Sequence, residues 1–187
     1  MTRDQLLAHP LTYYVRIAFG MLSFYLVWFV CLWGAVQGRH YLGPLLVLGT
    51  IVIHCIISPQ WRKDLAIIVL VSLSGSVLDS AYMALGMMEY ATPNPLIPWL
   101  CPLWLTSLYA LFAMTVDHSL AWIQRHWSLA VISGALGGAF SYIAGERVHA
   151  VHFLWSYSTV VVAIAIVWAI VTPSWLYMSR KIHRFFS

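Results

Sequence analysis

Six long apolar runs, separated by short polar breaks, decide what this chain can fold into. A hydrocarbon core of about 30 Å is crossed by about 20 mostly apolar residues in a helix. Only helices and closed barrels satisfy the backbone there, and continuous apolar runs lack the alternation of barrel strands. The sequence therefore predicts an all-α transmembrane bundle whose six spans cover roughly residues 17–37, 42–59, 65–88, 95–116, 128–147 and 153–178.

Charged residues are too scarce to cover a water-exposed surface. They make up 9% of the 187 residues, and hydrophobic residues make up 61%, whereas soluble domains carry roughly 25% charged residues. This composition excludes a soluble domain and predicts one integral-membrane domain over residues 1–187. The basic residues are scattered between apolar runs and form no patch, so no nucleic-acid partner is expected.

The distribution of lysine and arginine predicts the orientation. Under the six-span model, eight of the ten basic residues fall on one side, and only Arg39 and Arg147 fall on the other. Cytoplasmic loops are enriched in these residues, so both termini are expected in the cytoplasm. The first apolar run is long and lacks a cleavage site of the signal-peptide type, which predicts a retained span.

Five tryptophans lie near the predicted span ends, where amphipathic rings favour the headgroup level. They are expected to anchor the helices there before they contact any ligand, and they are Trp99, Trp104, Trp127, Trp155 and Trp175.

Asp79 is the deepest carboxylate in the chain. At 1.5 Å per residue it lies roughly 14 Å inside the outer end of the third span, and an ionisable residue at that depth is a functional hypothesis by default. It belongs to a stripe of small and polar residues at helical spacing, which comprises Ser72, Gly75, Ser76, Asp79, Tyr82, Met83 and Gly86. The stripe is expected to face the bundle interior. Two interpretations stay open: a buried carboxylate satisfied by hydroxyl or indole donors, and a substrate or proton site.

Other ionisable residues form two groups around Asp79 in the six-span model. Glu146, Arg147, His149 and His152 gather at the predicted outer mouth, either as a solvated loop with a local ion pair or as a headgroup contact. The spacing of the two histidines lacks a third ligand, so no metal site is predicted. His54 lies at a depth similar to that of Asp79, which allows a histidine–aspartate pair across helices or a singly satisfied histidine.

Two further features concern contacts between helices and with headgroups. Gly134 and Gly138 form a GxxxG pair, which lets two helices approach closely. Asp117 and His118 close the fourth span, where they either cap the helix or bind a headgroup. Pro102 is expected to kink or break the fourth span.

Sequence signatures of several enzyme classes are missing. The chain contains no HExxH, no GxSxG and no P-loop, which weakens the corresponding metalloprotease, hydrolase and nucleotide-binding classes. The spacing of the residues identifies no bound cofactor. No two matching halves are apparent, which disfavours an ion-coupled carrier.

Four segments resemble a family of small polytopic bacterial inner-membrane proteins classed as a domain of unknown function. They contain the strings WFVCLWGAVQGRHYLGPLL, GSVLDSAYMALG, PLIPWLCPLWLTSLYALFAMTVDHSLAWI and GALGGAFSYIAGERVHAV. Members are often encoded beside relatives of cyclopropane-fatty-acid synthase, so the resemblance implies a bacterial inner-membrane location and a link to membrane lipid modification. This sequence differs from the family pattern at Asp117 and at Gly138-Ala139, which makes these positions poor candidates for catalysis.

The first functional hypothesis is an outward-opening polar pocket that binds, or helps to modify, a membrane lipid or another hydrophobic substrate. Asp79, His54 and Glu146 are the candidate catalytic residues. The candidate substrate-binding residues are Ser76, Tyr82, Trp104, His118, Tyr142, Arg147, His149 and His152. The second hypothesis is a non-catalytic assembly subunit whose glycine face and Asp79 stripe pack against a membrane partner or a second copy. A small-solute or proton-coupled transporter is the third.

Overall fold

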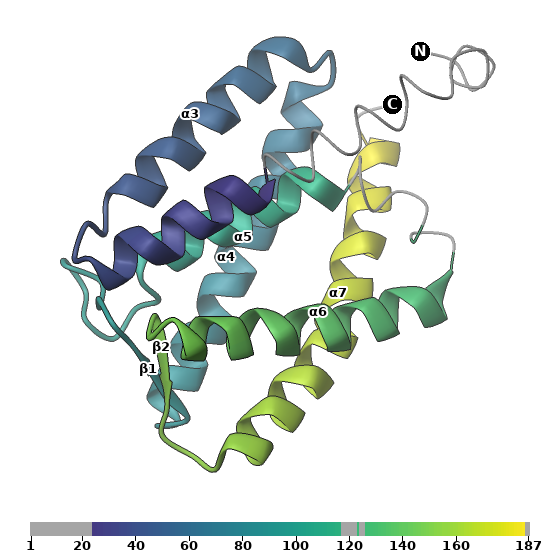
Figure 1. Ribbon diagram of the computed structural model, residues 1–187. Helices are drawn as coiled ribbons and strands as arrows, with labels where there is room; N and C mark the ends of the chain where they lie inside the picture. The colour runs from purple at the N-terminus through teal and green to yellow at the C-terminus, as the bar shows by residue number, and fades with distance from the viewer. Residues whose placement is uncertain (1–23, 117–122, 124–125, 186–187) are drawn as a thin grey trace.

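The computed structural model describes residues 24–116, 123 and 126–185 (Figure 1). The helices in this part of the chain are Phe24–Val36, α3 (Leu42–Ile57), α4 (Trp61–Ala84), α5 (Leu103–Val116), α6 (Trp127–Arg147) and α7 (Tyr157–Phe185). Two short strands, β1 (Met88–Tyr90) and β2 (Val151–Phe153), pair antiparallel. The predicted all-helical architecture is confirmed, with this strand pair as an addition.

Three helices are long and apolar enough to cross a membrane: α4, α6 and the Tyr157–Ile182 part of α7. The other three, Phe24–Val36, α3 and α5, are apolar but shorter. The helices therefore support a membrane protein, in agreement with the composition.

The helices pack around a shared apolar core. α4 packs against α5 and α6 packs against α7, while α3 contacts both α4 and α5. In Figure 1, α5 runs close to the Phe24–Val36 helix, and α6 crosses in front of α7. Buried side chains from all six of these helices join one cluster, which includes Cys31, Val47, Val71, Trp104, Tyr142 and Ile164.

Two predicted spans have different bounds in the structure, for reasons visible in the sequence. The span predicted at 65–88 corresponds to α4, which has the same length but begins and ends four residues earlier, and the span predicted at 95–116 corresponds to the shorter α5. α4 ends at Ala84 because the chain turns at Gly86, whose φ of 62° favours glycine. α5 begins only at Leu103, because proline lacks the backbone donor that a helix interior needs, and prolines stand at 95, 98 and 102. The predicted break at Pro102 is thus confirmed as a helix start.

The GxxxG pair provides the close approach that was predicted, and its partner is α7 of the same chain. A Cβ atom on Gly138 would lie 2.3 Å from Cγ of Trp168, and one on Gly134 would lie 2.6 Å from Oγ1 of Thr172. Only glycine permits this packing, so the face is already occupied within the chain.

The prediction of interfacial tryptophans is wrong for two of the five. Trp99, Trp127 and Trp155 are exposed, but Trp104 and Trp175 are 2% and 5% exposed. Trp175 donates its indole N–H to Oγ of Ser74 at 2.8 Å. Both rings pack in the core instead, where Trp104 lies edge-on against Tyr90 and Trp175 lies edge-on against Tyr109.

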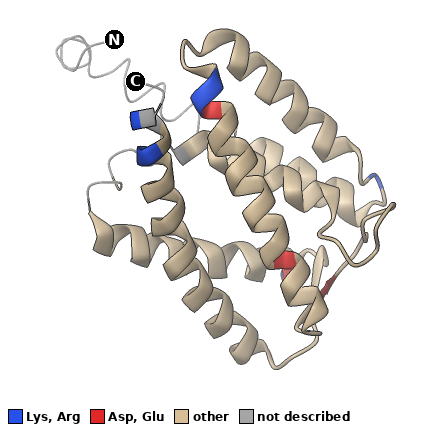
Figure 2. Ribbon diagram, turned by 180° about the vertical axis from the view of Figure 1, so that it is seen from behind, with Lys and Arg blue, Asp and Glu red and all other residues tan. Residues whose placement is uncertain are grey.

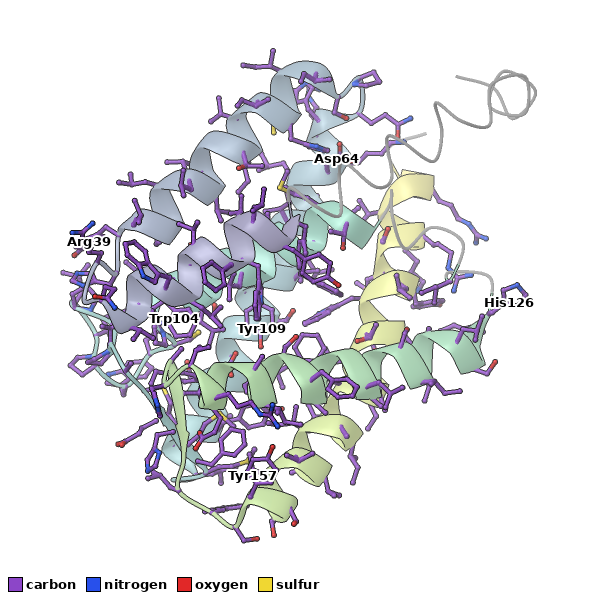
Figure 3. The ribbon with its side chains drawn as sticks, viewed as in Figure 1. Arg39, Asp64, Trp104, Tyr109, His126 and Tyr157 are labelled. Atoms are coloured by element: carbon purple, nitrogen blue, oxygen red, sulfur yellow. The ribbon has the colours of Figure 1, made fainter. Side chains whose placement is uncertain are left out.

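Lysine and arginine cluster at one end of the described structure. Figure 2 shows basic segments at the start of α4 and near the end of α7 on the same side of the molecule. Arg39 and Asp64 lie near opposite ends of α3 (Figure 3). Arg3, Arg16 and Arg125, which the count along the sequence assigns to the same side, lie outside the described residues, so the orientation stays a prediction.

Candidate functional site

Three tyrosine hydroxyls converge on the carboxylate of Asp79. Tyr142 donates to Oδ1 at 2.5 Å, Tyr109 donates to Oδ2 at 2.5 Å, and Tyr90 also donates to Oδ1. Asp79 is 0% exposed. The carboxylate is therefore held by α4, β1, α5 and α6 together.

The sequence of α4 makes room for this cluster. The predicted inward stripe is confirmed in its central part, because Gly75, Ser76, Asp79 and Tyr82 are all buried. Ser72 and Met83 are only partly buried, and Gly86 is exposed because α4 has already ended at Ala84. A Cβ atom on Gly75 would lie 2.4 Å from Cδ1 of Tyr109. Glycine at this position, about one helical turn before Asp79, lets the Tyr109 ring lie directly against α4.

The strand pair brings the third hydroxyl to the site. Tyr90 ends β1, and its Cα lies opposite that of Val151 in β2. Burial and the nearby carboxylate raise the pKa of the Tyr90 hydroxyl well above its usual range. Tyr90 therefore keeps its proton and acts as a donor.

The hydrogen-bond pattern fits an acceptor carboxylate. Each phenol has one proton, and an ionised carboxylate accepts bonds only, so three donors match one carboxylate group. Within the described residues, no lysine, arginine or histidine forms an ion pair with Asp79. The hydroxyls alone satisfy the acid in this part of the chain.

Aromatic rings form a layer beside the cluster. Trp168 stacks on Tyr109 at a centroid distance of 6.1 Å and an interplanar angle of 14°. Tyr142 packs edge-on against both Trp168, at 6.5 Å, and Tyr82, at 6.2 Å. Figure 3 shows Tyr109 near the centre of the molecule, between α5 and α6.

A cavity of about 520 Å³ lies against this aromatic layer. Tyr109 and Tyr142 form part of its wall, so two of the three hydroxyl donors separate the carboxylate from the cavity. The aromatic lining residues come from the Phe24–Val36 helix, α5, α6 and α7, and they are Phe24, Tyr25, Trp28, Tyr109, Phe112, Phe140, Tyr142 and Trp168. The volume lies within the roughly 300–1,000 Å³ typical of small-molecule sites.

Several predicted site residues lie close to Asp79 but play different parts. Tyr142 contacts the carboxylate directly. Tyr82 packs on Tyr142 and has no hydrogen-bond partner for its hydroxyl within the described structure. Ser76 bonds Thr106 at 2.8 Å, and Trp104 packs edge-on against Tyr90 at 6.0 Å.

Glu146, one of the ionisable residues predicted at the outer mouth, bonds the second strand of the pair. Glu146 accepts the backbone N–H of Phe153 at 2.9 Å, and its other oxygen lies 3.7 Å from Nδ1 of His152. Arg147, His149 and His152 are exposed. No three potential metal-ligating side chains gather in the described residues. Glu146 thus bonds the chain that follows α6, and no hydrogen bond joins it to Asp79 in this part of the structure.

The structure does not bring His54 to Asp79. Nε2 of His54 lies 2.9 Å from Oδ2 of Asp64, which also accepts a bond from Ser58 at 2.6 Å. Asp64 precedes Asp79 by 15 residues of α4, roughly 22 Å along the helix. The proposed pair of His54 and Asp79 is therefore corrected to His54 and Asp64, because α3 ends beside the start of α4. His118 lies outside the described residues.

The sequence interpretation missed two of the three tyrosines. Tyr109 lies in the middle of an apolar run, and a phenol at that depth was the available signal, because a buried hydroxyl usually needs a partner. Tyr90 lies in a polar break with no periodic pattern, so its position depends on the strand pair alone.

A family model described as "Protein of unknown function (DUF2878)" matches residues 17–174. The chain belongs to this family. The matched range contains Asp79, all three tyrosines and Trp168, so the whole cluster lies within the DUF2878 region. The resemblance to a family of unknown function is confirmed in this respect. Neither the curated proteins nor the solved structures provide a match to the chain.

Proposed function

We propose that this DUF2878 protein is a six-span bacterial inner-membrane protein that binds a membrane lipid or another hydrophobic molecule in its central cavity. The cavity against Tyr109 and Tyr142 carries the proposal. Its wall is mainly aromatic and apolar, which suits a ligand that enters from the bilayer. Both termini lie in the cytoplasm in this proposal, since basic residues gather at the start of α4 and near the end of α7.

Asp79 has a central role in the proposed site. Its carboxylate orients the hydroxyls of Tyr109 and Tyr142, and both residues form the cavity wall. Because each of these two phenols donates its one proton to Asp79, a ligand group that reaches this wall would meet hydroxyl oxygens that can accept a hydrogen bond. The alternative of an assembly subunit has less support, because its proposed glycine face packs on Trp168 within the chain.

A leucine at position 137 should block ligand binding without disturbing the fold. Gly137 lines the cavity, and a Cβ atom there would meet nothing within 4 Å. We expect Gly137→Leu to lose the lipid that co-purifies with the wild-type protein in mild detergent. Native mass spectrometry with lipid extraction measures the bound species.

Gly49→Leu is the matched control. Gly49 is also an exposed helical glycine with open space around its Cβ position, but it does not line the cavity. It should retain the bound molecule. Equal loss from both variants, or a wild-type protein that carries no ligand, would contradict the proposed function.

The proposed orientation predicts which engineered thiols can be labelled. Gln37 and Gln60 are exposed and flank the two ends of α3. With Cys55 replaced by serine and the buried Cys31 and Cys101 left in place, a membrane-impermeant maleimide should label Gln37→Cys in intact spheroplasts. Gln60→Cys should react only after the membrane is permeabilised. The reverse pattern would invert the topology, and labelling of both positions from outside would show that α3 does not cross.

A further inference from the structure

We propose that the cavity takes the positively charged group of a hydrophobic organic cation, such as a quaternary ammonium or phosphonium group. This inference rests on the proposed function of the cavity and names the class of molecule that it binds. Three observations carry it: the aromatic wall, the sign of the nearby charge, and the size of the space.

The wall of the cavity is unusually rich in aromatic rings. Eight of its 18 lining residues are aromatic, although such residues make up 15% of the chain. The faces of aromatic rings attract cations, and groups of such rings bind quaternary ammonium compounds. An acyl chain alone needs only apolar contact, so this enrichment indicates a ligand group that benefits from the ring faces.

The charges around the cavity favour a cation over an anion. No lysine, arginine or histidine is among its lining residues in the described structure, so an anionic group would lack a counter-charge there. Behind Tyr109 and Tyr142 lies the Asp79 carboxylate. A negative charge inside a bilayer is costly. A cation bound on the other side of these two phenols would attract the carboxylate, and this attraction is strong because the region between them has a low dielectric constant.

The volume of about 520 Å³ accommodates such a group. It has room for a compact aromatic cation, or for a trimethylammonium group with the first part of its chain. Phe140 is 65% exposed and lines the cavity. Its ring is therefore available to a ligand that arrives from the lipid side.

The test compares two probes of the same size and opposite charge, tetraphenylphosphonium and tetraphenylborate, by isothermal titration of the full-length protein in a non-ionic detergent. We expect the wild-type protein to bind the cation about tenfold more tightly or better. Asp79→Asn should reduce this preference to below about threefold. Glu89→Gln, which removes an exposed carboxylate outside the cavity, should keep it.

Each outcome separates the inference from the proposed function. If the wild-type protein binds the cationic and the anionic probe with equal affinity, and Gly137→Leu binds neither, the preference for a cation is contradicted. The cavity then remains a binding site. If Gly137→Leu binds the probes as the wild-type protein does, the cavity is not the binding site, and the proposed function is contradicted as well. If Asp79→Asn does not fold, the test uses Phe140→Leu in its place. Phe29→Leu is the matched control, since Phe29 is 58% exposed and does not line the cavity. Loss of cation affinity in both phenylalanine variants, or in neither, would contradict the aromatic contact.

A displacement experiment identifies the source of the cation. Lysophosphatidylcholine and free choline are titrated against bound tetraphenylphosphonium. We expect the lipid to displace the probe at a lower concentration, because its chain fills the apolar part of the cavity. Displacement by choline at the same concentration would assign the site to a free organic cation.

Discussion

Gly138→Leu is expected to prevent the chain from reaching its folded state. A Cβ atom at this position would lie 2.3 Å from Cγ of Trp168, 2.6 Å from its Cβ and 2.6 Å from its Cδ2. A leucine adds three more carbon atoms in the same direction. Overpacking of a core typically costs about 1–3 kcal/mol, and we expect a loss of about 3 kcal/mol or more, because the bulky Trp168 ring also contacts Tyr109 and Tyr142.

Gly137→Leu provides the control at the neighbouring position. It adds the same atoms to the same helix, but a Cβ atom there meets nothing within 4 Å. Thermal unfolding, followed by the loss of monodisperse protein on size exclusion, should separate the two variants clearly. Equal melting temperatures would show that α6 and α7 do not pack as described.

Asp79→Leu is expected to have the second-largest effect. Leucine has a similar volume but accepts no hydrogen bond, so the hydroxyls of Tyr90, Tyr109 and Tyr142 would lose their common acceptor. Hydrogen bonds between membrane helices contribute about 0.6–1.7 kcal/mol each. Three of them predict a loss of about 2–5 kcal/mol in the free energy of unfolding.

Two milder variants show whether the hydroxyls act together. Asp79→Asn keeps one acceptor oxygen and should lose less than half as much stability as Asp79→Leu. Tyr142→Phe removes one donor and should cost about 0.6–1.7 kcal/mol. Unfolding in mixed micelles of increasing denaturing detergent measures all three. An Asp79→Leu protein as stable as the wild type would mean that the phenols have other partners.

Much of the helical architecture could be predicted, because lipid imposes few solutions on an apolar chain. α6 matches its predicted range, 128–147, to within one residue at its start. The ends of α4 and α5 were less predictable, since they depend on the turn at Gly86 and on how far the prolines keep the chain out of a helix. The strand pair was not predicted, because three-residue strands carry no detectable period.

The site was predictable only where one helix carried the signal. The inward direction of Asp79 follows from the spacing along α4, and the burial of Asp79, Gly75, Ser76 and Tyr82 confirms it. Gly86 was wrongly included, because the helix ends before it. His54 was placed by depth alone, and depth does not determine which neighbour a side chain contacts; its neighbour is Asp64. The convergence of Tyr90 and Tyr109 on one carboxylate is a tertiary property that local patterns do not contain.

The separation of the three tyrosines along the chain has a consequence for biogenesis. Tyr90, Tyr109 and Tyr142 follow Asp79 by 11, 30 and 63 residues. At about 5–20 residues per second, synthesis takes about 3–13 s to pass from Asp79 to Tyr142. During that interval the carboxylate lacks at least one of its donors, although a charged side chain at the centre of a membrane helix costs about 2.5–3.5 kcal/mol. The carboxylate can therefore receive all three of its hydrogen bonds only after α6 has been made.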